Sequence, residues 1–293
     1  MRAISWATGD ISDPSLRDRF GVDLSMANTQ SQLTDTVSRR GNFVARFAQG
    51  ASDLQRAQHL RHHCFVEAAG RAPQPGGLDQ DQFDAMCDHI LVEDSAGTLL
   101  CCFRLMSFAS GAQIGASYSA QYYDLERLKT YSAPLLELGR FCVDPSVQDP
   151  DVLRLAWGMV AAVVDARGAG MLFGCSSFAG TDNAAFGQAF DLLAEKHLSP
   201  AQWRPKVHSD EVVRFADHAG DVVDRRLALA QVPSLLKSYL AMGGWVSDHA
   251  VIDRLMNTLH VFTALEIANI PPARAAALRA VAATAPHPSI GPT

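Results

Sequence analysis

The sequence predicts an α/β fold in which a mixed central sheet is flanked by helices and followed by a C-terminal extension. Apolar runs with strand spacing come first, and strand and helix patterns then alternate, an order typical of a sheet covered by helices. The chain has 293 residues, of which 48% are hydrophobic and 19% charged, enough to bury a sizeable core. We expect one domain at residues 42–293, after a flexible polar extension at residues 1–41.

The first predicted elements are a strand and a helix. Residues 42–48 (NFVARFA) have the composition of a short strand. Ser52 is a favourable N-cap, and Gln55 lies three residues later, as in a capping box. We therefore expect the helix to run from residue 53 to about residue 67, before a loop rich in proline and glycine.

The middle of the chain predicts more strands and a long helix. Residues 90–93 and 98–106 read as two strands joined by a turn, and residues 134–143 as a buried strand. Residues 151–167 have helical spacing, and Gly168 is a natural stop for that helix.

The last elements follow the same alternation. Residues 171–176 predict a strand, and residues 183–197 a helix capped by Thr181 or Asp182. Beyond residue 200 the pattern is weaker. A helical or loop stretch (VPSLLKSYLAMGGWV) precedes a strand at residues 258–266 and an alanine-rich helical tail.

Composition narrows the functional classes. The formal net charge is −6 and there is no basic stripe, so we expect no nucleic-acid partner. The six cysteines form no CxxC pair, which is typical of packed thiols in a reducing compartment. The N-terminus lacks the apolar core of a secretory signal, and no apolar run reaches the roughly 18 residues of a membrane span. We expect a cytoplasmic protein, with peripheral contact at the inner membrane left open.

Two charged residues stand in the apolar run LLELGRFCV. Glu137 and Arg140 are expected to be partly buried there, which is costly unless each charge is paired. Residues three apart in a strand face opposite sides, but a bulge at Gly139 would bring both to one side. The pair is either a structural ion-pair network that includes Arg104, or a site in which Glu137 takes a proton from an attacking amine.

An acidic loop precedes the second strand. Asp79, Asp81 and Asp84 are either solvated, as charge runs usually are, or they hold a cationic substrate beside a cleft. Their spacing lacks the glycine and terminal glutamate of a calcium loop, so we expect no metal. Arg104 lies inside the apolar run CCFRLM, and its guanidinium group can bind both oxygens of a carboxylate.

These segments together resemble the ornithine lipid N-acyltransferases, a haemolysin-like branch of the GNAT proteins. The resemblance rests on DQFDAMCDHILVED, FRLM, YSAQYYDLERL, LLELGRFCVDP and MLFGCSSFAGTD, and on PSLLKSYLAMGGWV with Asp253 and Phe262 further on. It covers about residues 43–270. A more distant similarity to acyl-homoserine-lactone synthases is carried by seven residues: Arg61, Phe65, Asp81, Asp84, Arg104, Glu137 and Arg140.

The resemblance implies a GNAT-like fold and a transfer reaction. A 3-hydroxyacyl chain would pass from acyl carrier protein to the α-amino group of L-ornithine, giving lyso-ornithine lipid. No cofactor is implied beyond the acyl-phosphopantetheine of the carrier protein. The run DPSVQDPDVLRLAWG lacks the glycine pattern that binds the pyrophosphate of coenzyme A in related enzymes, which favours the carrier protein as donor.

The resemblance also implies roles for the site residues. Glu137 would be the base, through a water molecule, and Arg140 would support the strand or the donor phosphate. Substrate contacts would come from the remaining five residues: Arg61, Phe65, Asp81, Asp84 and Arg104. The aspartates would hold ammonium groups, and Arg104 a carboxylate or Glu137 itself. Two alternatives remain, an acyl-homoserine-lactone synthase and a non-catalytic protein that binds lipid or membrane.

Overall fold

The computed structural model describes residues 36–218 and 224–282. Most of the predicted extension at residues 1–41 lies outside the described residues, although a first strand, β1, occupies Val37–Arg40. None of the helices in the described ranges is both long enough and apolar enough to cross a membrane.

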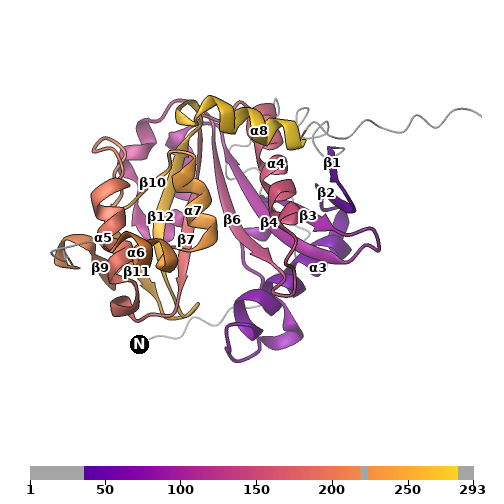
Figure 1. Ribbon diagram of the computed structural model, residues 1–293, viewed down its shortest axis with the longest axis horizontal. Coiled ribbons are helices and arrows are strands. Elements are labelled where there is room, and N and C mark those ends of the chain that lie inside the picture. Colours follow the sequence, from indigo (N-terminus) through magenta and orange to yellow (C-terminus); the bar gives the residue numbers. More distant parts are fainter. Residues whose placement is uncertain (1–35, 219–223, 283–293) are drawn as a thin grey trace, which may run out of the picture.

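One mixed sheet of ten strands organises the molecule (Figure 1). Its order is β1-β2-β3-β4-β6-β7-β12-β11-β9, and β10 pairs with β12 beside this path. The strands are β1 (Val37–Arg40), β2 (Phe43–Phe47), β3 (Asp88–Glu93), β4 (Leu99–Phe108), β6 (Leu135–Val143), β7 (Met171–Ala179), β9 (Val212–Arg214), β10 (Trp245–Val246), β11 (His249–Asp253) and β12 (Thr258–Glu266). Two further short strands, β5 (Tyr123–Asp124) and β8 (Lys206–Val207), pair with each other.

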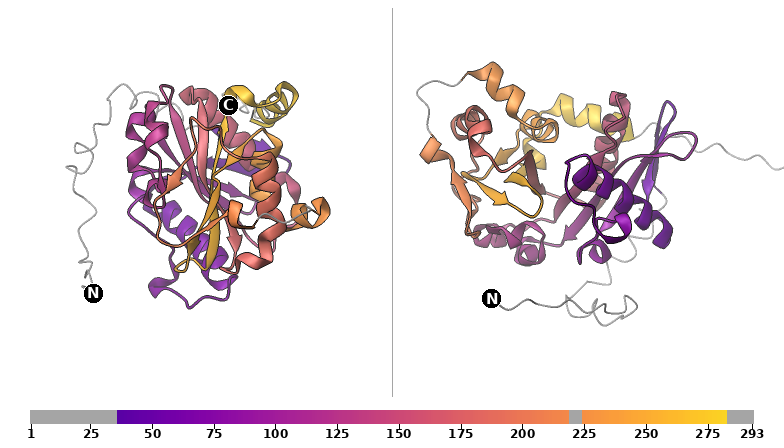
Figure 2. Two further views of the ribbon diagram at one scale, coloured as in Figure 1. Left: turned by 90° about the vertical axis from the view of Figure 1, so that its left-hand side faces the viewer. Right: turned by 90° about the horizontal axis from the view of Figure 1, so that it is seen from below.

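Helices cover both faces of this sheet. They are α3 (Gly50–His62), α4 (Pro150–Arg167), α5 (Gly187–Lys196), α6 (Arg225–Gln231), α7 (Ser234–Ala241) and α8 (Pro272–Ala282). Buried side chains of α4, α5 and α7 share one apolar core with the sheet, and α3 packs on the opposite face with a second core. Seen from below, the first strands and α3 lie at one end of the molecule, and the orange segments after residue 200 at the other (Figure 2).

Most predicted elements are confirmed within two or three residues. The strand at residues 258–266 is found with those bounds, α4 begins one residue before the predicted start, and Gly168 ends it with a φ of 58°. Asp182 is a cap, since its side chain accepts from the N–H of Ala184. The helix predicted at residues 183–197 begins as a 3-10 turn, and α5 follows at Gly187–Lys196.

The predicted start of the first helix is wrong. The helix begins at Gly50, and Ser52 lies inside its first turn, with Gln49 as an N-cap that makes no side-chain bond. Asp53 replaces the expected cap, because its carboxylate accepts from the backbone N–H of Gln49 at 2.9 Å and from Arg46. The α-helix ends at His62, and one π-helical turn, His63–Glu67, completes the predicted length.

The centre of the sheet contains a seam. β6 and β7 are parallel neighbours, yet only three residue pairs join them, from Leu135–Met171 to Glu137–Phe173. Both strands continue for several residues beyond that point, each paired with its other neighbour. Glu137 therefore lies at the place where the two strands separate, which positions the candidate site.

Candidate active site

A β-bulge in β6 shapes the site. Cys102 of β4 pairs with Cys142, but Arg104, two residues later, pairs with Gly139, three residues earlier in β6. The extra residue is accommodated at Arg140, whose φ of 50° is in the left-handed region. Glu137 and Arg140 consequently face the same side of the sheet, as the predicted bulge required.

Glu137 is buried and held by three hydrogen bonds. Its Oε1 accepts from the backbone N–H and the hydroxyl of Ser119, at 2.7 and 2.6 Å, and its Oε2 accepts from the N–H of Tyr118 at 2.9 Å. Burial raises the pKa of Glu137, although the bonds from Ser119 and Tyr118 oppose the rise. The result is a buried carboxyl group whose proton affinity is higher than usual, as acid–base catalysis requires.

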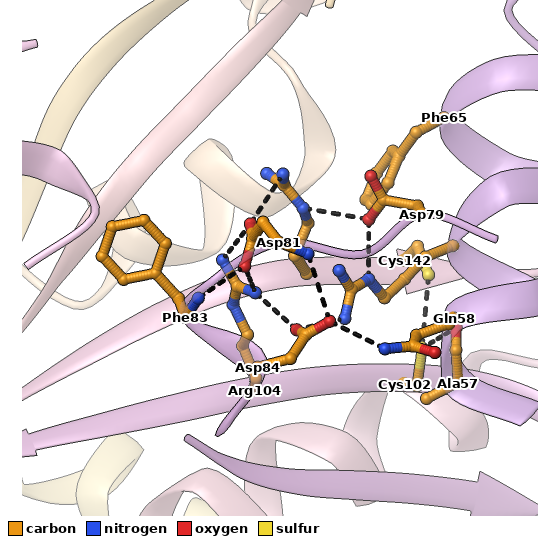
Figure 3. A network of polar contacts seen from close by, with 12 residues as sticks. Ala57, Gln58, Phe65, Asp79, Asp81, Phe83, Asp84, Cys102, Arg104 and Cys142 are labelled. Atoms are coloured by element: carbon orange, nitrogen blue, oxygen red, sulfur yellow. Dashed lines mark hydrogen bonds and ion pairs between the residues drawn. The ribbon is translucent and has the colours of Figure 1, made fainter. Parts of the chain in front are cut away.

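Three carboxylates and three guanidinium groups meet beside this strand (Figure 3). We call them the carboxylate–guanidinium cluster: Asp79, Asp81, Asp84, Arg61, Arg104 and Arg140. All but Asp81 and Arg140 have side chains exposed by 6% or less, and those two are exposed by 20% and 13%. The acidic loop is therefore not a fully solvated run of charges, because its three carboxylates are paired with arginines.

Arg61 joins α3 to the acidic loop. Its Nε donates to Asp79 and its Nη1 to Asp84, both at 2.7 Å. Burial raises the pKa of Asp84, but the charge and hydrogen bond of Arg61 outweigh it and the pKa falls to about 2. Arg61 itself is only 1% exposed. Its ion pairs with Asp79 and Asp84 therefore position the acidic loop against α3.

Arg104 and Arg140 join the loop to the sheet. Arg104 donates to Asp81 at 2.5 and 2.8 Å and to Asp84 at 2.6 Å. Arg140 donates to Asp79 and Asp81, each at 3.0 Å, and its guanidinium carbon lies 5.1 Å from the ring centre of Tyr118. The geometry fits the structural ion-pair interpretation for Arg104, which is paired with aspartates and makes no hydrogen bond with Glu137 in the described ranges.

Phe65 is an apolar residue at the border of this cluster (Figure 3). It is half-buried in the π-helical turn after α3 and packs against the core between α3 and the sheet. Its carbonyl accepts from Arg71 at 3.1 Å. The structure therefore brings six of the seven predicted residues together around β6, whereas Phe65 flanks them.

Sequence reasoning missed the segment that faces Glu137. Residues 111–130 form a series of 3-10 turns without apolar periodicity, and they place Tyr118 and Ser119 against the carboxylate. The hydroxyl groups of Tyr118 and Tyr122 lie 3.3 Å apart, and the Tyr122 ring lies 4.8 Å from that of His260. The run YSAQYYDLERL was part of the family resemblance, but no residue in it was given a role at the site.

Comparisons with known proteins agree with this architecture. The family model described as an acetyltransferase (GNAT) domain matches residues 60–158, which confirms the predicted GNAT-like fold. A protein of Rhodobacter capsulatus named L-ornithine N(alpha)-acyltransferase is 33% identical over 77% of this chain and 90% of its own length. A protein of the same name from Brucella abortus is 31% identical over 80% of this chain and 88% of its own length. Another from Rhizobium meliloti is 30% identical over 87% of this chain and 92% of its own length.

Two solved structures are also similar to this chain. An N-acyl amino acid synthase from uncultured soil microbes covers 79% of this chain and 93% of its own, with a TM-score of 0.46 and 12% identity. A CoA-dependent acyl-homoserine lactone synthase covers 80% of this chain and 90% of its own, with a TM-score of 0.42 and 12% identity.

Proposed function

Because this chain belongs to the L-ornithine N(alpha)-acyltransferase family, we propose that it transfers a 3-hydroxyacyl group from acyl carrier protein to the α-amino group of L-ornithine. The observation that carries the proposal is the 33% identity to a relative of that name over 90% of the relative's length. The product is an amphiphile with one acyl chain, the lyso-ornithine lipid that a second acylation would complete.

Glu137 is the proton acceptor in this proposal. An amino acid binds with its amine protonated, and the amine attacks a thioester carbonyl only after losing a proton. Glu137 keeps acceptor capacity on Oε2, which receives one hydrogen bond, and it lies where β6 and β7 separate. One ammonium proton passes to Glu137 through a water molecule, and the amine nitrogen bonds to the carbonyl carbon. The bond between the carbonyl carbon and the sulfur then breaks, and the second proton of the former ammonium passes to the sulfur, so that the donor leaves as a thiol.

Backbone N–H groups of β6 stabilise the oxyanion of this reaction. Beyond Glu137 the strand no longer pairs with β7, so N–H groups on that edge are available to a carbonyl oxygen in the seam. The left-handed residue Arg140 changes the direction of the backbone there. Tyr118, held by Glu137 on one side and by Arg140 on the other, forms the wall where the acceptor lies.

Acyl carrier protein is the donor protein in this proposal. The segment between β6 and α4 is short and contains no glycine, so it lacks the loop that binds a pyrophosphate. Acyl carrier proteins are acidic, and the basic residues that could contact one here are Arg154, Arg167, Arg204 and Lys206. Their partners lie in different parts of the chain: Arg154 pairs with Asp151, Arg167 with Asp88, Arg204 with the carbonyl of Ser199, and Lys206 lies 4.0 Å from Asp124. The absence of a pyrophosphate loop is therefore the stronger support.

Thiol release from 3-hydroxyacyl carrier protein tests the proposal. Ornithine, lysine, glutamine and S-adenosylmethionine are compared as acceptors, and the matching acyl-CoA and the acyl group without a 3-hydroxyl are compared as donors. We expect release with ornithine and carrier protein, and an N-acylated product by mass. Thiol release with S-adenosylmethionine and with none of the other acceptors would instead indicate a lactone synthase. Equal rates with acyl-CoA and with acyl carrier protein would show that the carrier protein is not the specific donor.

Replacing Glu137 with glutamine tests the proposed base. The variant E137Q should lose turnover by two or more orders of magnitude, on the order expected for removal of a general base. Its fold should be retained, as circular dichroism and urea unfolding would show. Full activity in E137Q would refute the assignment of Glu137.

A further inference from the structure

A second acidic position faces the same side of the sheet as Glu137. Along β12 the side chains of Phe262 and Ala264 join the core beneath the 3-10 segment, as Leu135 of β6 does. His260 lies two residues before Phe262 on β12, so its side chain is on the same face. On β11, Val251 belongs to the same core and pairs with His260, and Asp253, two residues after Val251, is on the same face as well. Asp253 and His260 therefore lie on the face that carries Glu137, across the seam from β6.

His260 has a buried acceptor without a donor. The side chain is 3% exposed, and its Nδ1 lies 3.1 Å from the hydroxyl oxygen of Tyr123. That hydroxyl donates its proton to the His260 carbonyl at 2.8 Å, so Nδ1–H donates to the hydroxyl oxygen and the lone pair is on Nε2. Nε2 has no partner among the described residues. Burial lowers the pKa of His260 to about 4, which keeps the ring neutral and Nε2 an acceptor.

Asp253 has a buried negative charge without a cation. It is 7% exposed, and its Oδ1 accepts from the backbone N–H of Met256 at 2.9 Å. In the described ranges no lysine or arginine pairs with it, in contrast to Asp79 and Asp84, which are bound by Arg61. A buried carboxylate of this kind is costly unless a cation joins it.

An aromatic path connects this acidic position to Arg140. The guanidinium of Arg140 lies 5.1 Å from the Tyr118 ring, that ring 5.4 Å from the Tyr122 ring, and the Tyr122 ring 4.8 Å from His260. Arg140, which also pairs with Asp79 and Asp81, is at one end of the path, and the acidic position is at the other. A molecule with a carboxylate at one end, a cation at the other and an aliphatic stem over the tyrosines fits this arrangement.

We infer that Asp253 and Nε2 of His260 bind the side-chain ammonium of a diamino acid acceptor, and so make the enzyme selective for an acceptor with a second amine. The inference rests on the proposed function. An ammonium group has three donors, and the carboxylate of Asp253 and the lone pair of His260 satisfy two of them. The acceptor carboxylate lies at Arg140, and the three methylene groups between the α-carbon and the side-chain nitrogen lie along Tyr118 and Tyr122.

Two acceptors of equal length separate this role from a structural one. Ornithine and 2-aminopentanoate differ by the δ-ammonium alone, so the ratio of their kcat/KM values measures what that charge contributes. In D253N the ratio should fall by about 10- to 100-fold, the loss of a charge-assisted hydrogen bond, while 2-aminopentanoate is used as well as before. The fall should be in KM for ornithine more than in kcat, because the amine lies away from the reacting atoms.

Two further variants complete the test. His260→Leu, which removes the acceptor, should lower the same ratio, and His260→Gln, which keeps an acceptor oxygen, should lower it less. The control is Glu211→Gln, which removes one negative charge at an exposed position paired with Arg254 and should leave the ratio unchanged.

The outcomes distinguish the inference from the function on which it rests. An unchanged ratio in D253N, or an equal loss with both acceptors, would overturn the inference while the proposed function stands. Wild-type enzyme that acylates 2-aminopentanoate and ornithine equally well would overturn it too. Wild-type enzyme that acylates neither would instead refute the proposed function, and the inference with it.

Discussion

Replacing Ser119 with alanine tests how Glu137 takes a proton, without changing Glu137 itself. The Ser119 hydroxyl donates to Oε1 of Glu137 at 2.6 Å, and this bond stabilises the charged carboxylate inside the protein. The backbone N–H groups of Ser119 and Tyr118 still donate in S119A. The ionised form of Glu137 is therefore stabilised less in S119A than in wild type, but it keeps the two hydrogen bonds from the backbone.

The magnitude follows from one charged hydrogen bond. Such a bond is worth about 1.5 to 3 kcal/mol, and each 1.36 kcal/mol corresponds to a factor of ten. Burial already raises the pKa of Glu137, and loss of the Ser119 hydroxyl raises it further. On the acidic limb of the pH profile, where the protonated form dominates, S119A should be about 10- to 100-fold slower than wild type. At high pH, where Glu137 is ionised in both proteins, the rates should converge.

Thiol release measured across the pH range in which both proteins are folded provides the assay. Ser117→Ala is the matched control, because its hydroxyl accepts from the N–H of Ala120 in the same turn and makes no bond to Glu137. Its acidic limb should coincide with that of wild type. An unmoved acidic limb in S119A, or a rate reduced equally at all pH values, would refute Glu137 as the group that must be ionised.

Two further predictions concern stability. The neutral His260 ring contributes stability that is complete above the ordinary pKa of 6.5 and is lost as pH falls toward its folded value of about 4, because the unfolded chain takes up the proton first. Because of this group, the free energy of unfolding of wild type in urea should fall by about 2 kcal/mol between about pH 8 and about pH 5. The fall should be smaller in H260Q and equal to that of wild type in H208Q, at an exposed position. Equal falls in all three proteins would contradict the role of His260. In Gly174→Ala the new methyl group would lie 2.3 Å from the carbonyl oxygen of Leu138, so the strands must shift at the seam. We expect a loss of about 1 to 3 kcal/mol in the same assay and slower thiol release, whereas Gly187→Ala, which meets nothing within 4 Å, should show neither change.

The sequence predicted those features that depend on local chemistry. Residues 258–266 are rich in β-branched and aromatic residues and are a strand with those bounds, and Gly168 supplies the left-handed C-cap that ends α4. The bulge near Gly139 was also predictable, because two charges in an apolar strand had to reach one side. Family resemblance located five of the six residues of the carboxylate–guanidinium cluster before the structure showed how they pair, and Asp79 was noted only as part of the acidic loop.

The remainder depended on contacts between distant segments. Ser52 satisfied the local pattern for a cap, but Arg46 fixes Asp53 at the helix start from a neighbouring strand. The turns at residues 111–130 have no periodicity to reveal that Ser119 would reach Glu137, 18 positions later. Nothing local to Asp253 indicates that its carboxylate has no lysine or arginine partner among residues 36–218 and 224–282, since that follows from which arginines the fold brings near the other aspartates.

The short pairing between β6 and β7 has a mechanical consequence. A ten-stranded sheet normally resists bending at its centre, where neighbouring strands are joined along their whole length. Here the centre is joined by three residue pairs, and the cluster of arginines and aspartates stiffens the side that carries β4 and β6. Separating β6 from β7 would therefore break fewer backbone hydrogen bonds than separating β4 from β6 or β7 from β12, so the seam is the weakest line of strand pairing near the middle of this sheet.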